Sequence, residues 1–223
     1  MATRLYLRNT TINTDAGLTA EQSSAKPVGT LNASLSLRDL NTVKGSAQLD
    51  LSRNSLAQTT HQDGIRYVGF SAGLVVTQID ANTWSFGLAS NEANTNANTF
   101  TTVTLYVWRP STNAVVGFII DDDTPRGVEW GATEDGQVFT VSGSAVSGVQ
   151  AGDQVVFEWW YHSVQGMATA YLQQFFYDGA TDVVDATTTD AASYIETPQD
   201  LFTAPPEFLP HNRTPLLGPI LAQ

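Results

Sequence analysis

Apolar and polar residues alternate over short segments of this chain, most clearly between residues 154 and 162. One face of that segment would carry Val155, Phe157, Trp159 and Tyr161, and the other Val156, Glu158, Trp160 and His162. Successive side chains of a β-strand point to opposite faces of a sheet, so this pattern predicts a strand. Since both faces hold large apolar groups, we expect this strand to lie in the middle of a sheet.

Weaker alternation predicts the other strands of a fold with about ten in all. They fall at residues 3–8, 31–38, 47–52, 67–79, 84–88, 100–108, 114–120, 137–141, 168–177 and 194–196. Turn residues at 110–113 join two of these segments into a hairpin, and Gly69 and Gly73 suggest a bulge or bend in another. The last segment is expected to pair beside the first, which would tie the two ends of the domain together.

Other segments lack periodicity and are rich in turn-forming residues. Residues 9–30 are predicted to form a long surface loop or extended arm, and residues 90–98 a shorter loop. No helical period appears, and only two lysines occur in the 223 residues, so the composition typical of surface helices is missing. We therefore predict an all-β fold, an antiparallel two-sheet β-sandwich that is jelly-roll-like, over residues 1–197.

The last segment, residues 198–223, differs in composition from the rest. It holds six of the nine prolines, and proline fixes an extended backbone and removes a hydrogen-bond donor from any ladder. We therefore predict an extended Pro-rich C-terminal arm. Its apolar side chains need a covering surface and are the candidate interface with neighbouring subunits: Phe202, Phe208, Leu209, Leu216, Leu217, Ile220 and Leu221.

Composition and charge narrow the choice of function. Hydrophobic residues make up 42% of the chain, enough for one folded domain. Cysteine is absent, which excludes disulfides and thiolate chemistry, and we expect neither a signal peptide nor a membrane span. The net charge is −12, with fifteen acidic and only two basic residues between 121 and 223. Such a surface repels nucleic acid.

Catalytic signatures are also missing from the sequence. It contains no P-loop, dinucleotide fingerprint, zinc-protease motif, nucleophile elbow or EF-hand loop. The histidines, His61, His162 and His211, are widely spaced, which disfavours a histidine-based metal site or a catalytic triad. We therefore expect a protein that is not an enzyme and that needs no cofactor and no transition metal.

Three other types of site remain open on the sequence alone. A structural Ca²⁺ ion could use the carboxylates of residues 121–123 or those of Asp178, Asp182 and Asp185, although acidic loops are usually only solvated. A glycosidase pair could be drawn from Glu129, Glu134 and Glu158. Four aromatic residues could stack on sugar rings, or could belong to the core or to a subunit interface. They are Tyr106, Trp108, Trp130 and Trp160.

Several motifs occur in an order that resembles one group of viral proteins. They lie at residues 149–158, 177–179 with 181–182, and 187–190 before 194–196, with further similarity at 1–7 and from 64–70 into 84–87. In this order they resemble minor structural proteins of tailed bacteriophages, over residues 1–197. The resemblance implies a jelly-roll-like virion component and carries over no catalytic residues. The Pro-rich segment 198–223 departs from that pattern.

The resemblance and the apolar arm together lead to a functional expectation. We expect a capsid decoration or cement protein on the capsid surface of the virion, which binds the major capsid protein and itself, as a homotrimer or another cyclic oligomer. We expect no nucleic acid and no membrane as partners. The alternative is a tail-fibre or baseplate receptor-binding domain that binds a cell-surface glycan, and a polysaccharide-degrading enzyme is a third class.

Overall fold

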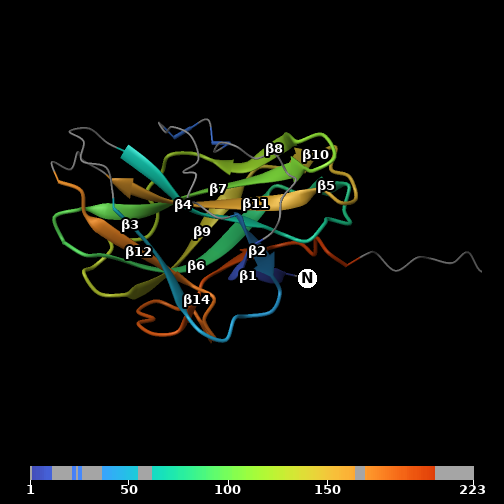
Figure 1. Ribbon diagram of the computed structural model, residues 1–223. Coiled ribbons are helices and arrows are strands. Elements are labelled where there is room, and N and C mark those ends of the chain that lie inside the picture. The colour runs from blue at the N-terminus through green and yellow to red at the C-terminus, as the bar shows by residue number, and fades with distance from the viewer. Residues whose placement is uncertain are drawn as a thin grey trace, which may run out of the picture.

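The computed structural model describes residues 2–11, 22–23, 25–26, 37–54, 62–163 and 169–203 (Figure 1). All regular elements in these ranges are β-strands, so the predicted all-β class is confirmed. No helix that could cross a membrane is found in the described ranges. The strands are β1 (Thr3–Thr11), β2 (Leu37–Asn41), β3 (Leu49–Asn54), β4 (Gln62–Phe70), β5 (Gln78–Ile79), β6 (Asn82–Glu92), β7 (Thr99–Arg109), β8 (Ala114–Asp121), β9 (Asp135–Gly143), β10 (Val146–Ser147), β11 (Gln154–Ser163), β12 (Leu172–Tyr177), β13 (Thr181–Asp182), β14 (Ala191–Ala192) and β15 (Tyr194–Thr197).

Eleven of these strands form one continuous hydrogen-bonded sheet. Its order is β3-β12-β6-β15-β1-β2-β4-β11-β7-β8, with β9 paired to β6. Two-stranded sheets of β5 with β10 and of β13 with β14 complete the fold. Pairing is mixed, because β2 runs parallel to β4 and β13 runs parallel to β14. The sequence predicted purely antiparallel pairing, and these two parallel pairs differ from that expectation.

The strand with the strongest alternation is central, as predicted. β11 lies between β4 and β7, and Trp159 faces Tyr67 on one side and Val103 on the other. Its predicted faces are also confirmed, because Phe157 and Trp159 lie in the main core while Trp160 lies in a second cluster. The alternation in sequence was therefore sufficient to assign both faces of this strand.

The main core lies between distant parts of the sheet, which must therefore fold over on itself. Phe157 on β11 lies 5.9 Å from Phe86 on β6, measured between ring centroids, although the two strands are far apart in the hydrogen-bonded order. In Figure 1, β7, β8 and β11 lie above β6 and β12. The folded sheet thus encloses apolar side chains from both of its halves.

A second hydrophobic cluster covers the outer face of β4, β7 and β11, and part of the predicted loop 9–30 lies against it. Trp160 is fully buried in this cluster, and Lys26 Nζ lies 5.6 Å from its ring centroid. Lys26 itself is buried, and β1 continues through Thr11. A surface loop was therefore the wrong prediction for these parts of the segment, because the methylenes of a lysine can cover an aromatic ring while its ammonium finds acceptors.

Two other local predictions need correction. β6 continues to Glu92 inside the predicted loop 90–98, and the buried Glu92 carboxylate accepts hydrogen bonds from Thr99 N at 3.0 Å and Thr99 Oγ1 at 2.7 Å. The register of β4 against β11 shifts between Trp159 and Trp160. This irregularity lies opposite residues 65–67 and not at Gly69, whereas β4 ends at Phe70 and the chain bends at Ala72, next to Gly73.

The two ends of the domain pair as the sequence predicted. β15 runs antiparallel to β1, with Ile195 opposite Leu5 and Tyr194 opposite Tyr6. The other edge of β15 pairs with β6, where Ile195 lies opposite Phe86. The last strand therefore lies inside the sheet and joins the N-terminal strand to the rest of the core.

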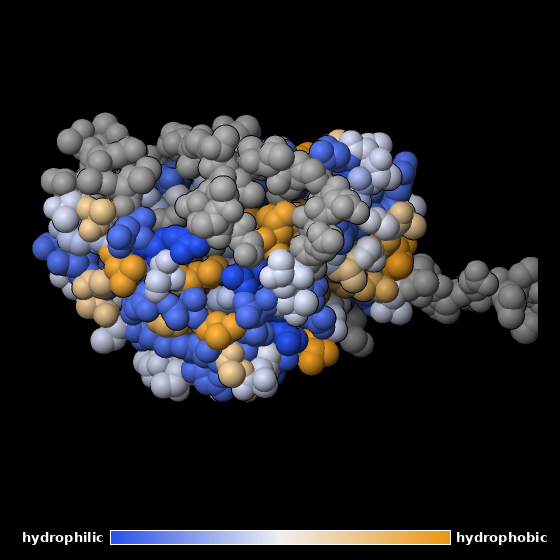
Figure 2. Space-filling view, viewed as in Figure 1, coloured by the Kyte–Doolittle hydropathy of each residue, from blue (hydrophilic) through white to orange (hydrophobic). Residues whose placement is uncertain are grey.

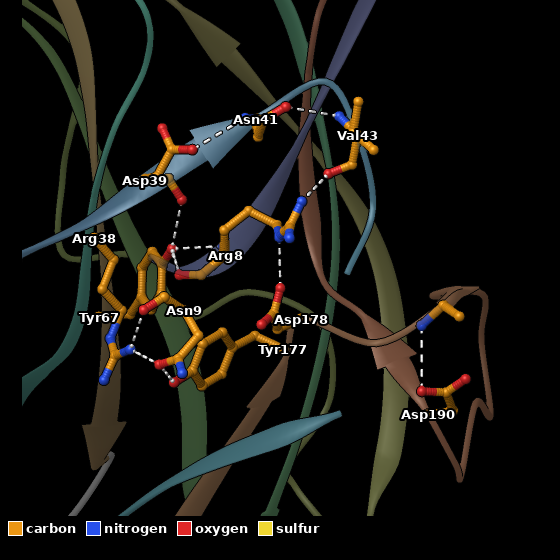
Figure 3. A network of polar contacts seen from close by, with 11 residues as sticks. Arg8, Asn9, Arg38, Asp39, Asn41, Val43, Tyr67, Tyr177, Asp178 and Asp190 are labelled. Carbon is orange, nitrogen blue, oxygen red and sulfur yellow. Dashed lines mark hydrogen bonds and ion pairs between the residues drawn. The ribbon is translucent and has the colours of Figure 1, made fainter. Parts of the chain in front are cut away.

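A polar network joins β1, β2 and β4 and the residue that follows β12 (Figure 3). The Tyr67 hydroxyl accepts a hydrogen bond from Arg8 N at 3.0 Å, and its single proton lies between two acceptors, the main-chain oxygens of Arg8 and Asp39, each 3.0 Å away. The Arg8 guanidinium binds Asp178 at 2.5 Å and donates to Val43 O at 2.7 Å. Burial raises the pKa of Tyr67 well above its usual value, so this hydroxyl remains a donor at neutral pH.

Candidate functional site

The first residues of the predicted C-terminal arm pack against the body of the domain. Leu201 is fully buried, and its main-chain oxygen accepts a hydrogen bond from Val75 N at 3.0 Å. Gln199 accepts from Asp80 N at 3.0 Å and donates to Gln78 O at 3.2 Å. Packing therefore continues past residue 197, where the sequence placed the end of the domain.

Only one of the seven candidate interface residues lies within the described part of the chain. Phe202 is partly buried, packs against the main core of its own domain and lines a small depression with Leu5 and Leu40. The other candidates lie outside the described residues: Phe208, Leu209, Leu216, Leu217, Ile220 and Leu221. Leu201 and Phe202 thus attach the last described residues to the body of the domain.

Exposed apolar residues on the described body are few and separated. Figure 2 shows small hydrophobic areas among hydrophilic ones on the face that it presents. The most exposed are Val43, Val128 and Val184. Val128 and Val138 line a depression of about 310 Å³ with Asp135 and Asp185. Isolated apolar residues of this kind are normal on soluble domains.

The aromatic residues considered as a sugar platform are not on the surface. Tyr106, Trp108, Trp130 and Trp160 are all buried. Three of them belong to the second hydrophobic cluster, and Trp130 Nε1 donates to Thr101 Oγ1 at 3.2 Å. The stacking platform was a wrong prediction, and the alternative assignment of these residues to a core is confirmed.

The acidic loop after β12 does not gather its carboxylates into a calcium site. Asp178 binds Arg8, Asp182 binds Arg4 and Lys44 at 3.2 Å, and Asp185 accepts from Val138 N at 2.8 Å. Burial acts to raise the pKa of Asp182, but hydrogen bonds from Tyr6 and Lys44 outweigh it and lower the pKa overall. These carboxylates therefore bind separate partners within the fold.

The glutamates considered as a catalytic pair each have a separate environment. Glu158 is fully buried and accepts hydrogen bonds from Tyr106 Oη at 3.0 Å and Gln22 N at 3.1 Å. Glu134 is partly buried and accepts from Gln48 Nε2 at 2.8 Å, whereas Glu129 is exposed. Burial is the main cause that raises the pKa of Glu134.

His162 has metal-ligating neighbours that its sequence position did not suggest. Its Nδ1 atom lies 3.0 Å from Asp63 Oδ1 and 3.2 Å from Asp123 Oδ1. Asp63 and His162 come together because they face each other across β4 and β11, although they are 99 positions apart in the chain. The wide spacing of the histidines in the sequence gave no sign of these neighbours, and His61 and His211 lie outside the described residues.

Other charged residues lie near Asp63, Asp123 and His162, on the face of the sheet that carries the second hydrophobic cluster. Lys26 Nζ donates to Val103 O, Thr104 Oγ1 and Asp122 O at 2.7 to 3.3 Å. Burial lowers the pKa of Lys26, and nearby carboxylates, led by Asp63, oppose that change. Asp122 also binds Arg126 at 2.5 Å. Of the three acids at 121–123, only Asp123 reaches the histidine within the described contacts.

Comparison with known proteins adds no family assignment. No protein-family model matches this chain, and no curated protein matches its sequence. The likeness to bacteriophage structural proteins thus rests on the order of the sequence motifs alone.

Proposed function

We propose that this protein is a structural component of a bacteriophage particle, a decoration or cement protein that binds the capsid surface. In this proposal the folded sheet is a jelly-roll-like two-sheet sandwich, and the C-terminal sequence is an extended arm that contacts the major capsid protein and neighbouring copies. The protein would assemble as a trimer or another cyclic oligomer, since closed symmetry repeats one contact around a shell.

The observation that supports this proposal is the anchored start of the apolar C-terminal sequence. Leu201 and Phe202 attach it to the body, and six apolar residues and five prolines follow from residue 204 onward. Fully burying even three of those side chains would stabilise a contact by roughly 4–9 kcal/mol before ordering costs. The described body offers only small, separated apolar areas, so an interface of useful size depends on that sequence.

The glycan-binding alternative loses its main argument with the burial of the aromatic residues. A stacking surface requires exposed rings, and Trp108, Trp130 and Trp160 are not exposed. A receptor-binding domain therefore stays the second candidate, without a binding surface assigned to it.

A binding experiment on particle fractions tests the proposal. The full chain and a chain ending after Thr203 would be mixed with separated heads and tails and sedimented. We expect the full chain to sediment with heads and the shorter chain to remain in solution. Binding to tails alone, or glycan-array binding that persists in the shorter chain, would favour the receptor-binding alternative.

A double variant separates the arm's chemistry from its length. Leu216→Asp with Leu217→Asp should abolish head binding, because two charged groups cannot be buried at an apolar contact without large cost. Asn212→Asp with Thr214→Asp is the matched control, since it adds the same charge at polar positions of the same segment. Equal loss of binding in both variants would point to charge repulsion and contradict an apolar contact.

A further inference from the structure

We propose that Asp63, Asp123 and His162 bind a divalent transition-metal ion, for which Zn²⁺ is the best chemical match. The three ligand atoms lie within 4.8 Å of one another. Metal bonds of about 2.1 Å at tetrahedral or octahedral angles place neighbouring ligand atoms roughly 3.0–3.4 Å apart. The observed separations of 3.0 and 3.2 Å from His162 Nδ1 to the two carboxylate oxygens fall in that range.

Both carboxylates approach the same ring nitrogen of His162. An imidazole carries at most one proton on Nδ1 and ionised carboxylates are acceptors only, so the ring nitrogen can donate fully to one carboxylate and not to both. The ammonium of Lys26 donates to Val103 O, Thr104 Oγ1 and Asp122 O. A divalent cation would balance two carboxylates with a neutral imidazole.

Two of the three side chains are buried, so the balance of charge within the cluster affects its stability. The Asp63 side chain is 0% exposed and the His162 side chain 6% exposed, while Asp123 is 31% exposed and provides access from solvent. Buried carboxylates are costly unless paired or bound to a metal. The sheet therefore encloses the site around Asp63 and His162, and the segment after β8 that holds Asp123 leaves it accessible to solvent.

A second observation, independent of the three ligands, comes from Thr102 on β7. This residue is fully buried, and its hydroxyl oxygen has no hydrogen-bond partner in the described part of the chain. Thr102 lies opposite Trp160 of β11. Trp160 and His162 are two residues apart on β11, so their side chains point to the same face of the sheet. At the other edge of β7, Thr104 pairs with Asp121 and Thr101 forms a bridge with Arg126. Residues 122 and 123 lie between these two pairs in the chain and therefore pass beside Thr102.

In this proposal the Thr102 hydroxyl holds a water molecule that completes the coordination of the ion. A buried polar atom without a partner is uncommon and calls for a water, an ion or a functional role. Zn²⁺ sites with three protein ligands keep such an open position. The mixed donor set also decides the class of metal, since Ca²⁺ and Mg²⁺ take oxygen ligands while an imidazole nitrogen suits Zn²⁺.

Calorimetric titration of the chelator-treated full chain tests this site directly. We expect one saturable site for ZnCl₂ per chain, weaker binding of MnCl₂, and a rise in melting temperature with Zn²⁺, because binding to the native state alone stabilises it. Absence of saturable Zn²⁺ binding, or tighter binding of Ca²⁺ than of Zn²⁺, would overturn the proposal.

Matched variants locate the ion. Asp123→Asn should weaken Zn²⁺ binding at least tenfold, whereas Asp122→Asn makes the same charge change on the adjacent residue and should leave it within about twofold. His162→Gln should abolish the visible absorption of the Co²⁺-substituted protein, with circular dichroism confirming the fold. Zn²⁺ binding that is unchanged in Asp123→Asn and His162→Gln would place the ion elsewhere. An equal loss of affinity in Asp122→Asn and Asp123→Asn would show that Zn²⁺ is attracted only by the negative charge of this segment.

The role of Thr102 has its own readout. Thr102→Val removes a hydroxyl that has no protein partner among the described residues, so the metal-free protein should be equally stable or more stable. Zn²⁺ binding should weaken by about tenfold or more, as is typical when an outer partner of a metal site is lost. Unchanged Zn²⁺ affinity in this variant would contradict the assigned water position.

Discussion

Trp159 and Phe175 meet edge to face in the main core, with ring centroids 4.6 Å apart and ring planes at 81°. Trp159 lies on β11 and Phe175 on β12, strands from opposite halves of the folded sheet. Trp159 Nε1 also donates to Thr101 Oγ1 at 3.2 Å. Trp159 is therefore fixed by a hydrogen bond to β7 while its ring packs against the opposite half of the sheet.

Replacing Trp159 should cost much of the stability of the domain. Trp159→Ala removes a fully buried ring and should lower the free energy of unfolding by about 3–5 kcal/mol. Denaturant titration with intrinsic fluorescence from the other tryptophans measures this change. A midpoint close to that of the parent protein would show that the two halves of the sheet do not depend on this ring.

A glycine directly opposite a tyrosine provides a second test of the packing. Gly64 on β4 faces Tyr161 on β11, and a Cβ atom at Gly64 would lie 2.0 Å from Tyr161 Cε1. Because Tyr161 is buried and has little room to move, Gly64→Ala should destabilise the fold by about 1–3 kcal/mol. Gly131→Ala is the control, since an added Cβ there meets only Thr133 O at 4.0 Å. Equal melting temperatures for the two variants would contradict the close approach.

The local pattern was sufficient to predict some of this structure. Trp159 and Trp160 could be assigned to opposite faces of β11 because alternation in a strand depends only on neighbouring positions. The pairing of β15 with β1 was also predicted, from a short apolar segment near the end of the domain. The first signal lies in neighbouring residues, and the second in the position of the two segments near the two ends of the domain.

Other contacts that depend on strand order could not be predicted from the sequence. The parallel pairing of β2 with β4 has no local signal, and Asp63 meets His162 only because β4 and β11 are neighbours in the sheet. Lys26 gave the opposite signal, since a lysine in a polar segment suggests an exposed loop, yet it lies over Trp160. The candidate metal ligands were therefore visible in the sequence only as single residues.

The ion pair at the turn before β11 makes the stability depend on pH. Asp153 accepts hydrogen bonds from Arg109 at 2.9 and 2.7 Å and from Gln150 N at 2.8 Å. Burial acts to raise the pKa of Asp153, but these hydrogen bonds outweigh it, so its pKa is lower in the folded state than in the unfolded state. The stabilisation is fully present above the unfolded pKa of about 3.9 and is lost as the pH falls through the lower folded pKa.

Asp153→Asn should remove that pH-dependent part of the stability. We expect a lower melting temperature than the parent protein at pH 7, and a difference that shrinks as the pH falls from about 4 towards 2. Differential scanning calorimetry over this pH range measures both quantities. A difference that stays constant across the range would mean that the carboxylate is not stabilised by Arg109.

The length of the folded domain can be determined by two truncations. A chain ending after Thr197 loses Leu201, whose burial contributes roughly 1.5–3 kcal/mol, together with its hydrogen bond from Val75 N. Its melting temperature should fall by about 3–12 °C for a domain of this size. A chain ending after Thr203 keeps these contacts and should melt within about two degrees of the full chain. Leu201→Ala in the full-length protein separates the effect of the side chain from that of chain length and should reproduce most of the loss.

The same two chains decide whether the C-terminal sequence serves its own domain or a neighbour. If the apolar residues after 203 contact other subunits, the chain ending after Thr203 should keep its melting temperature in dilute solution and lose self-association in sedimentation. A fall in melting temperature at constant oligomeric state would show instead that Phe208, Leu216 and their neighbours cover the domain that carries them. The arm would then have no apolar surface left for the capsid, and the decoration function would lose the interface on which it depends.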